Sequence, residues 1–443
     1  MNDKITFKEG QKAGMEFLVS HATALLADDI GFGKTVEVIA ALNYLKAKKI
    51  LIVCPATMKD HWEEKLKEFA DYPYRVQVLY GTKMKLDIAA DVWILNYDLL
   101  ITYYTRIKKQ IRYGVSVYDE SHRIKNMEGK RTRRVFHPKY GLAPRAKYRW
   151  FITGTPQQNR PIDLYPILSV FFPDLLGRAT NYRTYQYKFC GAYDGIDGRM
   201  VLGFPSSRAK EDLFKMLKYF MLRRERPRSH GLIWQEIHLE KTREYQALED
   251  QQKQRVEYDK YTAENLMDII PILNHQQLWH EASKLVAKQS LDHIKDLLTS
   301  VDKLLVFAYH RESIGVLLEG LKAYHPLVIH GGIPSRKRTD IKNAFITKPT
   351  HKVFIGQIDS MGEGMDGLQY VCCNMVFVET NYSPKTIKQC VGRLAREGQK
   401  HSVMAQLLLI KGGISQDIWK LASKKGVVID EIVKPTHQIE SKN

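Results

Sequence analysis

Residues 25–42 read LLADDIGFGKTVEVIAAL, in which an apolar run leads into a glycine-rich turn followed by apolar residues at helical spacing. The residues suited to phosphate are Gly31, Gly33, Lys34 and Thr35. Such a turn directs backbone N–H groups and a helix N-terminus at phosphates, with lysine on the β and γ oxygens and threonine on Mg²⁺. Asp28 stands where the general pattern has its first glycine. We interpret the stretch as a nucleotide-binding loop, with a plain glycine-rich loop as the alternative.

Short apolar runs separated by helix-length segments occur in two series along the chain. The first series comprises residues 50–55, 92–97, 115–120 and 149–155. The second comprises residues 303–310, 326–332, 352–358, 374–380 and 403–410. Near-continuous apolar strands that alternate with helices are typical of a parallel sheet covered on both faces. The fold class we expect is therefore α/β, with two parallel-sheet domains.

The middle of the chain has a different composition. Residues 181–204 are rich in Tyr and Gly, and their Asp-Gly dipeptides predict a hairpin at 190–204 or a long loop. Residues 211–227 have the apolar spacing of an amphipathic helix, and 241–300 are helical by composition. We expect a first α/β domain, a mostly helical insertion with a linker, and a second α/β domain, at residues 1–175, 176–285 and 286–443.

The charge of the chain indicates a polyanionic partner. The formal net charge is +19, and residues 129–149 carry eight Lys or Arg and no acid. Basic side chains release counterions from phosphates, so such an excess favours nucleic acid over a merely solvated basic face.

Membrane and secreted classes are not indicated. No run approaches the roughly 18–20 apolar residues of a membrane span, and the N-terminal MNDKITFKEG lacks an apolar signal segment. The five cysteines form no CxxC pair, so we expect no structural zinc and reduced thiols. The expected location is the cytoplasm of a bacterial or phage-infected cell, or another intracellular location, and not the secreted fraction.

Residues 115–126, VSVYDESHRIKN, place two adjacent acids where an apolar run ends. Alone, they are equally compatible with a solvated turn. A P-loop ATPase, however, needs one carboxylate at the end of a neighbouring strand to hold Mg²⁺ through its water shell, and another to orient and deprotonate the attacking water. Asp119 and Glu120 fit these two tasks.

Residues 389–399, QCVGRLAREGQ, bring a third element. Arg393 and Arg396 are three residues apart, so on a helix they would share one face. Arginines supplied by a second domain can neutralise charge on a transferring phosphate, which would couple hydrolysis to domain closure. A surface helix is the alternative for this segment taken alone.

Five segments together resemble motifs I, II, III, V and VI of superfamily 2 helicases, in chain order DDIGFGKT, DESHRIKN, FITGTPQQN, GEGMDGL and QCVGRLAREGQ. DESHRIKN followed by TGTPQQN is similar to the Swi/Snf branch. The resemblance extends from Gln11 to about Trp419. The middle segment, from KFCGAYDG to MLRR, resembles HARP-type annealing helicases and compact phage branch-migration helicases.

The resemblance implies two RecA-like domains with ATP and Mg²⁺ bound in their cleft. The residues it assigns to the nucleotide are Gln11, Asp29, Gly31, Gly33, Lys34, Thr35 and Gly364, with Gly10 in place of the usual aromatic before Gln11. Thr35 and Asp119 would hold Mg²⁺. The catalytic set would be Lys34, Asp119, Glu120, Gln389, Arg393 and Arg396. Thr153 and Thr155 would couple the two domains, and Ser121 replaces the more usual Ala.

The resemblance also implies DNA bound across both domains through its phosphates. The segments expected to face DNA are CPATM (54–58), NYD (96–98) and HGGIPSRKR (330–338). The expected function is ATP-dependent DNA translocation that remodels forked or branched DNA. The alternatives are a duplex translocase that displaces or slides bound proteins, and a nucleotide-gated binding module without turnover. The preferred junction and the oligomeric state stay open.

Overall fold

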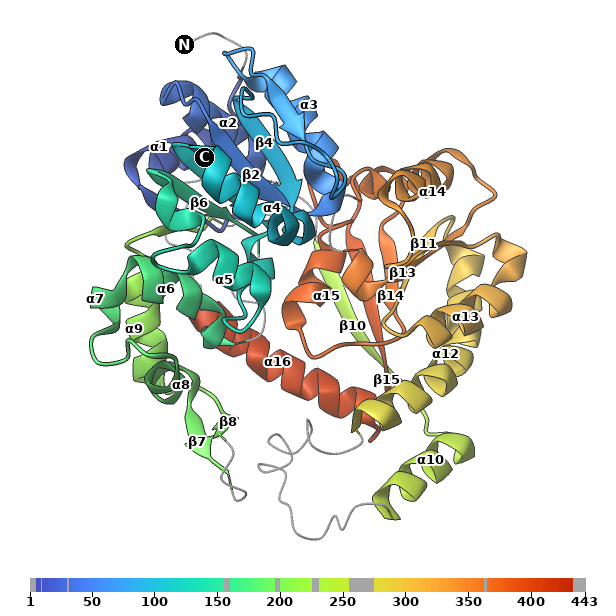
Figure 1. Ribbon diagram of the computed structural model, residues 1–443. Helices are drawn as coiled ribbons and strands as arrows, with labels where there is room; N and C mark the ends of the chain where they lie inside the picture. Colours follow the sequence, from blue (N-terminus) through green and yellow to red (C-terminus); the bar gives the residue numbers. More distant parts are fainter. Residues whose placement is uncertain are drawn as a thin grey trace, which may run out of the picture. The chain divides into compact units, whose positions relative to one another are not determined.

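The computed structural model divides the chain into two compact units, Met1–Pro227 with Val428–Asn443, and Arg228–Val427 (Figure 1). Each unit is built around its own parallel sheet. This arrangement confirms the predicted α/β class with two parallel-sheet domains. The structure describes residues 5–8, 10–29, 32–154, 156, 160–195, 200–224, 231–254, 275–361 and 365–432.

Within the described residues, the sheet of the first unit has seven strands in the order β3-β4-β2-β5-β6-β1-β9. Every neighbouring pair is parallel. The strands are β1 (Thr23–Leu26), β2 (Ile50–Cys54), β3 (Val76–Val78), β4 (Val92–Asn96), β5 (Val115–Asp119), β6 (Tyr148–Ile152) and β9 (Met221–Leu222). Because parallel strands point the same way, the segments that follow β1, β5 and β6 leave the sheet at one edge.

Helices cover both faces of this sheet, so its strands are apolar on both sides. Ile50 and Ile52 of β2 belong to one core, and Leu51 and Val53 to the other. The first core includes side chains of α1 (Gln11–Ser20), α2 (Lys34–Tyr44) and α3 (Lys59–Phe69). The second is covered by α4 (Tyr97–Gln110), α5 (Lys130–Phe136), α6 (Tyr165–Phe171), α7 (Pro173–Leu176), α8 (Tyr182–Cys190) and α9 (Ser207–Leu217).

The amphipathic helix predicted for residues 211–227 is wrong for residues 218–224, and residues 225–227 lie outside the described residues. Helix α9 ends at Leu217, and Met221–Leu222 form the edge strand β9 beside β1. Backbone bonds explain the change, because Leu25 N donates to Phe220 O at 2.7 Å and Ala27 N to Leu222 O at 2.8 Å. The apolar residues that continued the helical spacing therefore extend a sheet instead.

The stretch expected to contain a hairpin holds two short antiparallel strands, β7 (Ala192–Asp194) and β8 (Met200–Leu202) (Figure 1). Gly191 closes their base with a φ of +61°. A Cβ at this position would lie 2.1 Å from Phe204 O, so only glycine permits this close approach.

In the part of the second unit that the structure describes, six strands follow the order β10-β15-β14-β11-β13-β12. They are β10 (Leu232–Leu239), β11 (Leu304–Ala308), β12 (Leu327–Ile329), β13 (Val353–Gln357), β14 (Asn374–Phe377) and β15 (Val403–Ile410). The second predicted series of strands is thus confirmed. Strand β10, which precedes residue 286, was not predicted.

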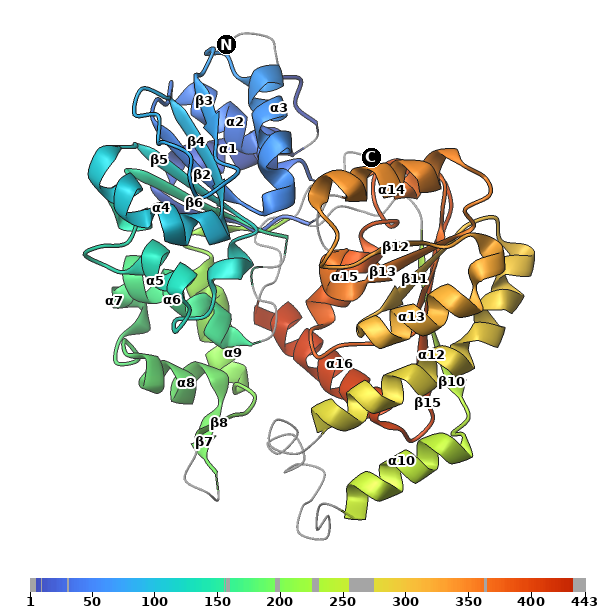
Figure 2. The same ribbon diagram turned by 45° about the vertical axis from the view of Figure 1, so that its right-hand side comes forward.

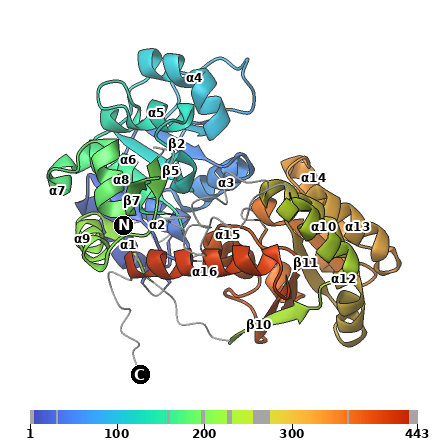
Figure 3. The same ribbon diagram turned by 90° about the horizontal axis from the view of Figure 1, so that it is seen from below.

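The helices of the second unit are α10 (Arg243–Gln254), α12 (His275–Ser300), α13 (Arg311–Gly320), α14 (Ser335–Thr347), α15 (Pro384–Val391) and, as far as Val427, α16 (Ile414–Ile432) (Figures 2 and 3). Helices α12 and α13 pack side by side over one face of the sheet. Helices α14 and α15 contribute to the core on the other face. Among the described helices, none has the length and apolar character to span a membrane.

Candidate active site

The glycine-rich turn connects β1 to α2, and Gly33 is the residue that precedes the helix. Its φ is +85°, in the left-handed region that favours glycine. A Cβ at this position would lie 2.3 Å from Gln11 Nε2. Both the backbone angle and the close approach of Gln11 therefore require glycine here. Lys34 and Thr35 then occupy the first turn of α2, where helix N–H groups can meet an anion.

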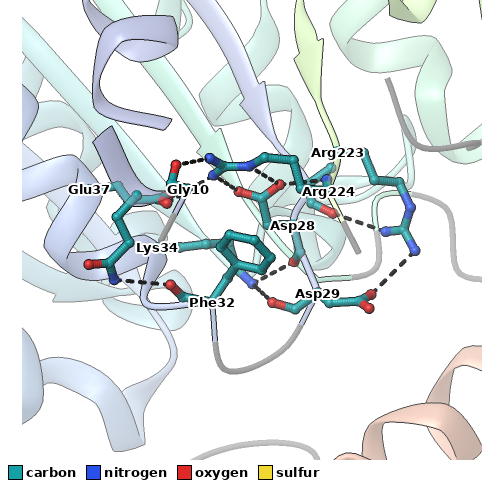
Figure 4. A network of polar contacts seen from close by, with 10 residues as sticks. Gly10, Asp28, Asp29, Phe32, Lys34, Glu37, Arg223 and Arg224 are labelled. Carbon is teal, nitrogen blue, oxygen red and sulfur yellow. Dashed lines mark hydrogen bonds and ion pairs between the residues drawn. The ribbon is translucent and has the colours of Figure 1, made fainter. Parts of the chain in front are cut away.

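Lys34 is folded onto its own loop (Figure 4). Its Nζ donates to Asp28 O at 2.7 Å and to Asp29 O at 3.0 Å. Gln11 fastens the loop from the other side, because its Nε2 donates to Phe32 O at 3.1 Å and its Oε1 accepts from Lys8 N at 2.9 Å. The side chains of Lys34 and Gln11 thus hold three backbone carbonyls of the loop, those of Asp28, Asp29 and Phe32.

Asp119 ends β5, and Glu120 follows with a φ of +49°. A non-glycine residue in this region is strained, and such strain is commonly found at functional sites. Asp119 Oδ1 accepts from Glu120 N at 3.0 Å, and its Oδ2 accepts from Trp62 Nε1 at 2.9 Å. Tyr97 Oη donates to Asp119 O at 2.7 Å. The strand end is therefore held at both its carboxylate and its backbone.

Glu120 meets the residue that follows β6. Thr153 Oγ1 donates to Glu120 Oε2 at 3.2 Å, and His122 Nδ1 lies 3.1 Å from both Glu120 Oε2 and Thr153 Oγ1. Thr153 is buried, whereas the Glu120 side chain is partly exposed. The segments DESH and TGT are thus joined through side chains at the sheet edge.

The sheet order explains why these residues lie at one edge. Strands β5, β6 and β1 are consecutive neighbours, and they lead to Asp119 with Glu120, to Thr153, and to the loop before Lys34. Ligands of parallel α/β sheets bind outside the carboxyl ends of the strands. The Thr35 hydroxyl and the Asp119 carboxylate are hard oxygen donors of the kind that Mg²⁺ prefers. The residues at this edge therefore fit a Mg²⁺–nucleotide.

A second group of charges, absent from the sequence predictions, lies behind the loop (Figure 4). Arg224 donates from its backbone N to Asp28 Oδ1 at 2.7 Å and from Nε to the same oxygen at 3.1 Å. Its Nη2 pairs with Asp28 Oδ2 and donates to Glu37 Oε1 at 2.9 Å, and its Nη1 donates to Gly10 O. Asp28 and Glu37 are 0% exposed, so this guanidinium holds two carboxylates inside the protein.

Two buried carboxylates around one guanidinium leave an excess negative charge. Burial and, to a lesser extent, the Asp28 carboxylate raise the pKa of Glu37, and Arg224 and Lys34 lower it, so that the pKa lies at about 8. Glu37 is therefore protonated at neutral pH. Nearby, Arg223 Nη1 donates to Ala27 O at 2.9 Å, and its Nη2 lies 3.4 Å from Asp29 Oδ1. In the sequence, this group of charges could have been suspected from the pair Arg223 and Arg224, which directly follows an apolar run.

In the second unit, the predicted helical face shared by Arg393 and Arg396 is wrong, because α15 ends at Val391. Tight turns follow the helix, with Arg393 N bonded to Cys390 O and Arg396 N to Leu394 O. Both arginines still reach one carboxylate, since Arg396 Nη1 pairs with Asp366 Oδ1 and Arg393 Nη1 lies 3.9 Å from it.

Other predicted residues lie in different places. Gln389 is buried on α15. The segments 54–58 and 96–98 follow the adjacent strands β2 and β4, and 330–338 follows β12. Gly31, Thr155 and Gly364 lie outside the described residues.

Comparison with known families decides the kind of protein to which this site belongs. Residues 10–304 match the SNF2-related domain, and residues 289–398 match the helicase conserved C-terminal domain. The chain belongs to the SNF2-related family. This membership confirms the resemblance to the Swi/Snf branch and implies that the nucleotide is ATP.

Curated relatives cover nearly the whole chain. The SWI/SNF-related matrix-associated actin-dependent regulator of chromatin subfamily A-like protein 1 homolog of Caenorhabditis elegans is 27% identical, over 95% of this chain and 61% of the relative. The DNA annealing helicase and endonuclease ZRANB3 of Mus musculus is 26% identical, over 94% of this chain and 40% of the relative. The chain thus spans 40% to 61% of the length of these two proteins.

Among solved structures, the Sulfolobus solfataricus SWI2/SNF2 ATPase core in complex with dsDNA is 24% identical to this chain. The match covers 97% of this chain and 93% of that chain, with a TM-score of 0.45.

Proposed function

We propose that the protein is a DNA-dependent ATPase that translocates on DNA and remodels forks or branched junctions. The observation that carries this proposal is the gathering of Lys34, Thr35, Asp119, Glu120 and Thr153 at one edge of the first sheet of an SNF2-related chain. Fold and family alone would leave the chemistry open, but these side chains are of the kinds that bind phosphates and Mg²⁺ and orient water in phosphoryl transfer.

In the proposed reaction, Lys34 leaves its loop carbonyls and binds the β and γ phosphates. Thr35 and Asp119 hold Mg²⁺, which would offset the negative charge that develops on the phosphates. Glu120 orients the attacking water and accepts its proton. Thr153 and His122 contact the Glu120 carboxylate, so they fix its direction toward the water.

Arg393 and Arg396 are the groups through which the second unit would act on the transition state. In this structure both guanidiniums lie near Asp366 Oδ1. This carboxylate is largely exposed, so water screens the pairs and they are weak. A phosphate could therefore replace Asp366 as the partner of Arg396.

DNA would be held through its phosphates, independently of sequence. The basic run of the sequence analysis supports this proposal, because its exposed residues include Lys130, Arg133, Arg134, Lys139 and Lys147. These residues lie on α5 and in the segment that follows it. Binding of this kind weakens steeply as the salt concentration rises.

The hairpin of β7 and β8 supports an action on junctions rather than on plain duplex. Tyr193 on β7 and Tyr187 on α8 are exposed, and Tyr187 Oη donates to Asp194 Oδ1 at 2.6 Å. Exposed aromatic rings can stack on unpaired bases where strands separate. The name of the mouse relative, a DNA annealing helicase, agrees with this assignment.

The test is a pair of assays with one protein preparation. Branch migration of a protein-free four-way junction is measured beside displacement of a protein bound to plain duplex, each with ATP. We expect the junction reaction to be the faster, and Glu120→Gln to abolish it. Replacement of residues 194–202 by a short Gly/Ser loop should abolish branch migration and leave DNA-stimulated ATP hydrolysis nearly unchanged. Efficient displacement without branch migration would favour the duplex translocase instead.

A further inference from the structure

Trp62 contacts the carboxylate assigned to Mg²⁺, although it belongs to no segment that the sequence marked as catalytic. It lies on α3, in the core under the sheet, and is 0% exposed. Its Nε1 donates to Asp119 Oδ2 at 2.9 Å, across 57 positions of sequence. The two residues come together because α3 packs on the sheet that contains β5 (Figure 2).

The indole N–H restricts the rotation of the Asp119 carboxylate together with the backbone N–H of Glu120. Rotation of a carboxylate about the bond that carries it is a broad, two-fold torsion, so packing alone does not fix its plane. Glu120 N holds Oδ1 at 3.0 Å, and Trp62 holds Oδ2. Two donors on two oxygens define the plane of the carboxylate.

We propose that Trp62 is a positioning residue for Mg²⁺, whose indole N–H orients the Asp119 carboxylate for the metal. This inference rests on the proposed function, since it assumes that Asp119 meets Mg²⁺–ATP. Groups that orient a metal ligand typically change metal affinity by about 10–100-fold when they are removed.

The same contact links the metal site to the proposed DNA surface. Helix α3 begins at Lys59, immediately after the segment 54–58 expected to face DNA. The other such segment of the first unit, 96–98, contains Tyr97, whose hydroxyl donates to Asp119 O. If DNA binding moves either segment, the movement would therefore change a hydrogen bond to Asp119. The contact through Trp62 acts on the carboxylate, whereas that through Tyr97 acts on the backbone.

Two substitutions at position 62 separate the effect of the indole N–H on the Asp119 carboxylate from the effect of the ring on packing in the core. Trp62→Phe keeps an aromatic ring in the core but removes the N–H donor. Trp62→His keeps a five-membered ring, with Nε2 in the place of the indole Nε1, and removes the fused benzene ring. Trp93→Phe is the matched control, since Trp93 is equally buried and its Nε1 donates to the backbone O of Asp87 at 2.8 Å.

The measurement is binding of a mant-labelled non-hydrolysable ATP analogue, in Mg²⁺ and in EDTA, followed by the anisotropy of the mant group. Wild type should bind more tightly in Mg²⁺; equal binding in both conditions would overturn the proposed function and not only this inference. Trp62→Phe should lower the ratio of the two dissociation constants about tenfold or more. Trp62→His should retain most of the ratio despite a lower melting temperature, and Trp93→Phe should retain all of it.

A double-mutant cycle that combines Trp62→Phe with Asp119→Asn tests whether Trp62 acts through this carboxylate. In that background, Trp62→Phe should change the Mg²⁺ ratio no further, because the group that it positions is already altered. The inference is overturned if Trp62→Phe leaves the ratio unchanged. It is equally overturned if the ratio follows the melting temperature across the Phe and His variants, since packing alone would then explain the effect.

Discussion

The first unit contains two carboxylate pairs near the same sheet edge, and their surroundings differ. Asp28 and Glu37 share the guanidinium of Arg224 and are closed off from water. Asp119 is held by an indole N–H and a backbone N–H, and Glu120 by a threonine hydroxyl. The first pair is neutralised by a cation and a proton. The second lies at the end of a strand and is oriented by hydrogen bonds, with His122 beside Glu120, so its carboxylates can serve a metal and a water.

This difference separates a structural role from a chemical one. A buried charge that loses its partner destabilises the fold, because the remaining charge has no solvent. A carboxylate oriented by hydrogen bonds at the end of a strand contributes less to stability and more to reaction. We therefore expect substitutions around Asp28 and Glu37 to change stability more than activity. Substitutions of Asp119 or Glu120 should change activity more than stability.

The largest effect should come from the second pair and the loop lysine. Glu120→Gln and Lys34→Ala should each lower DNA-stimulated ATP hydrolysis by about 10²-fold or more, since such groups supply that much of the rate. Steady-state hydrolysis at saturating DNA measures this, with DNA affinity and melting temperature as controls. Activity within about tenfold of wild type would exclude these roles.

Arg224→Gln should instead lower the free energy of unfolding of the first unit by about 3–5 kcal/mol, because it leaves Asp28 buried without its cation. Thermal unfolding followed by circular dichroism measures the loss. A matched control is Arg133→Gln, since Arg133 is exposed on α5 and should tolerate the change. An Arg224 variant as stable as the control would show that the buried pair does not depend on the guanidinium.

Glu37→Gln should have an effect that depends on pH. Wild-type Glu37 keeps its proton in the folded state up to about pH 8, whereas the unfolded chain loses it near the ordinary carboxyl pKa. Unfolding therefore releases a proton from Glu37 between these values, so the contribution of Glu37 to stability falls as pH rises, by up to about 1.4 kcal/mol per unit. The variant lacks this proton and should gain about 2–3 kcal/mol relative to wild type from pH 6 to pH 8.

Urea unfolding of both proteins at the two pH values measures this difference. A constant difference between variant and wild type would mean that Glu37 is charged throughout and that Arg224 neutralises both carboxylates.

The smallest effect concerns the strained backbone at Glu120. Glu120→Gly and Glu120→Ala lose the same side-chain contacts, but only glycine adopts a φ of +49° without strain. The glycine variant should be about 1 kcal/mol more stable than the alanine variant. Equal melting temperatures would show that the strain is negligible.

The two pairs also show how far the sequence could predict the molecule. The nine predicted strands were found because apolar runs bounded by turns are a local signal. Asp119 and Glu120 were found because they end such a run. The contacts of Trp62 and Arg224 with their acids were missed, since they join residues 57 and 196 positions apart. Strand β10 was missed because it lies at the edge of its sheet. Its residues are partly buried or exposed and do not form an apolar run.

The helix end at Val391 was missed for a different reason. The spacing of Arg393 and Arg396 fits a helix, but their backbone N–H groups bond to carbonyls two or three residues back. Residue spacing cannot distinguish a helix from such turns, because both bring these side chains near each other.

The central claim is that DNA controls ATP hydrolysis at the edge that contains Asp119 and Glu120. The most direct measurement is steady-state ATP hydrolysis by wild type without DNA and with single-stranded, duplex, forked and four-way DNA, over a series of salt concentrations. We predict a low rate without DNA, a several-fold increase with DNA that is greatest for the forked and four-way forms, and loss of the increase as salt rises. A rate that is the same with and without every DNA would contradict the account.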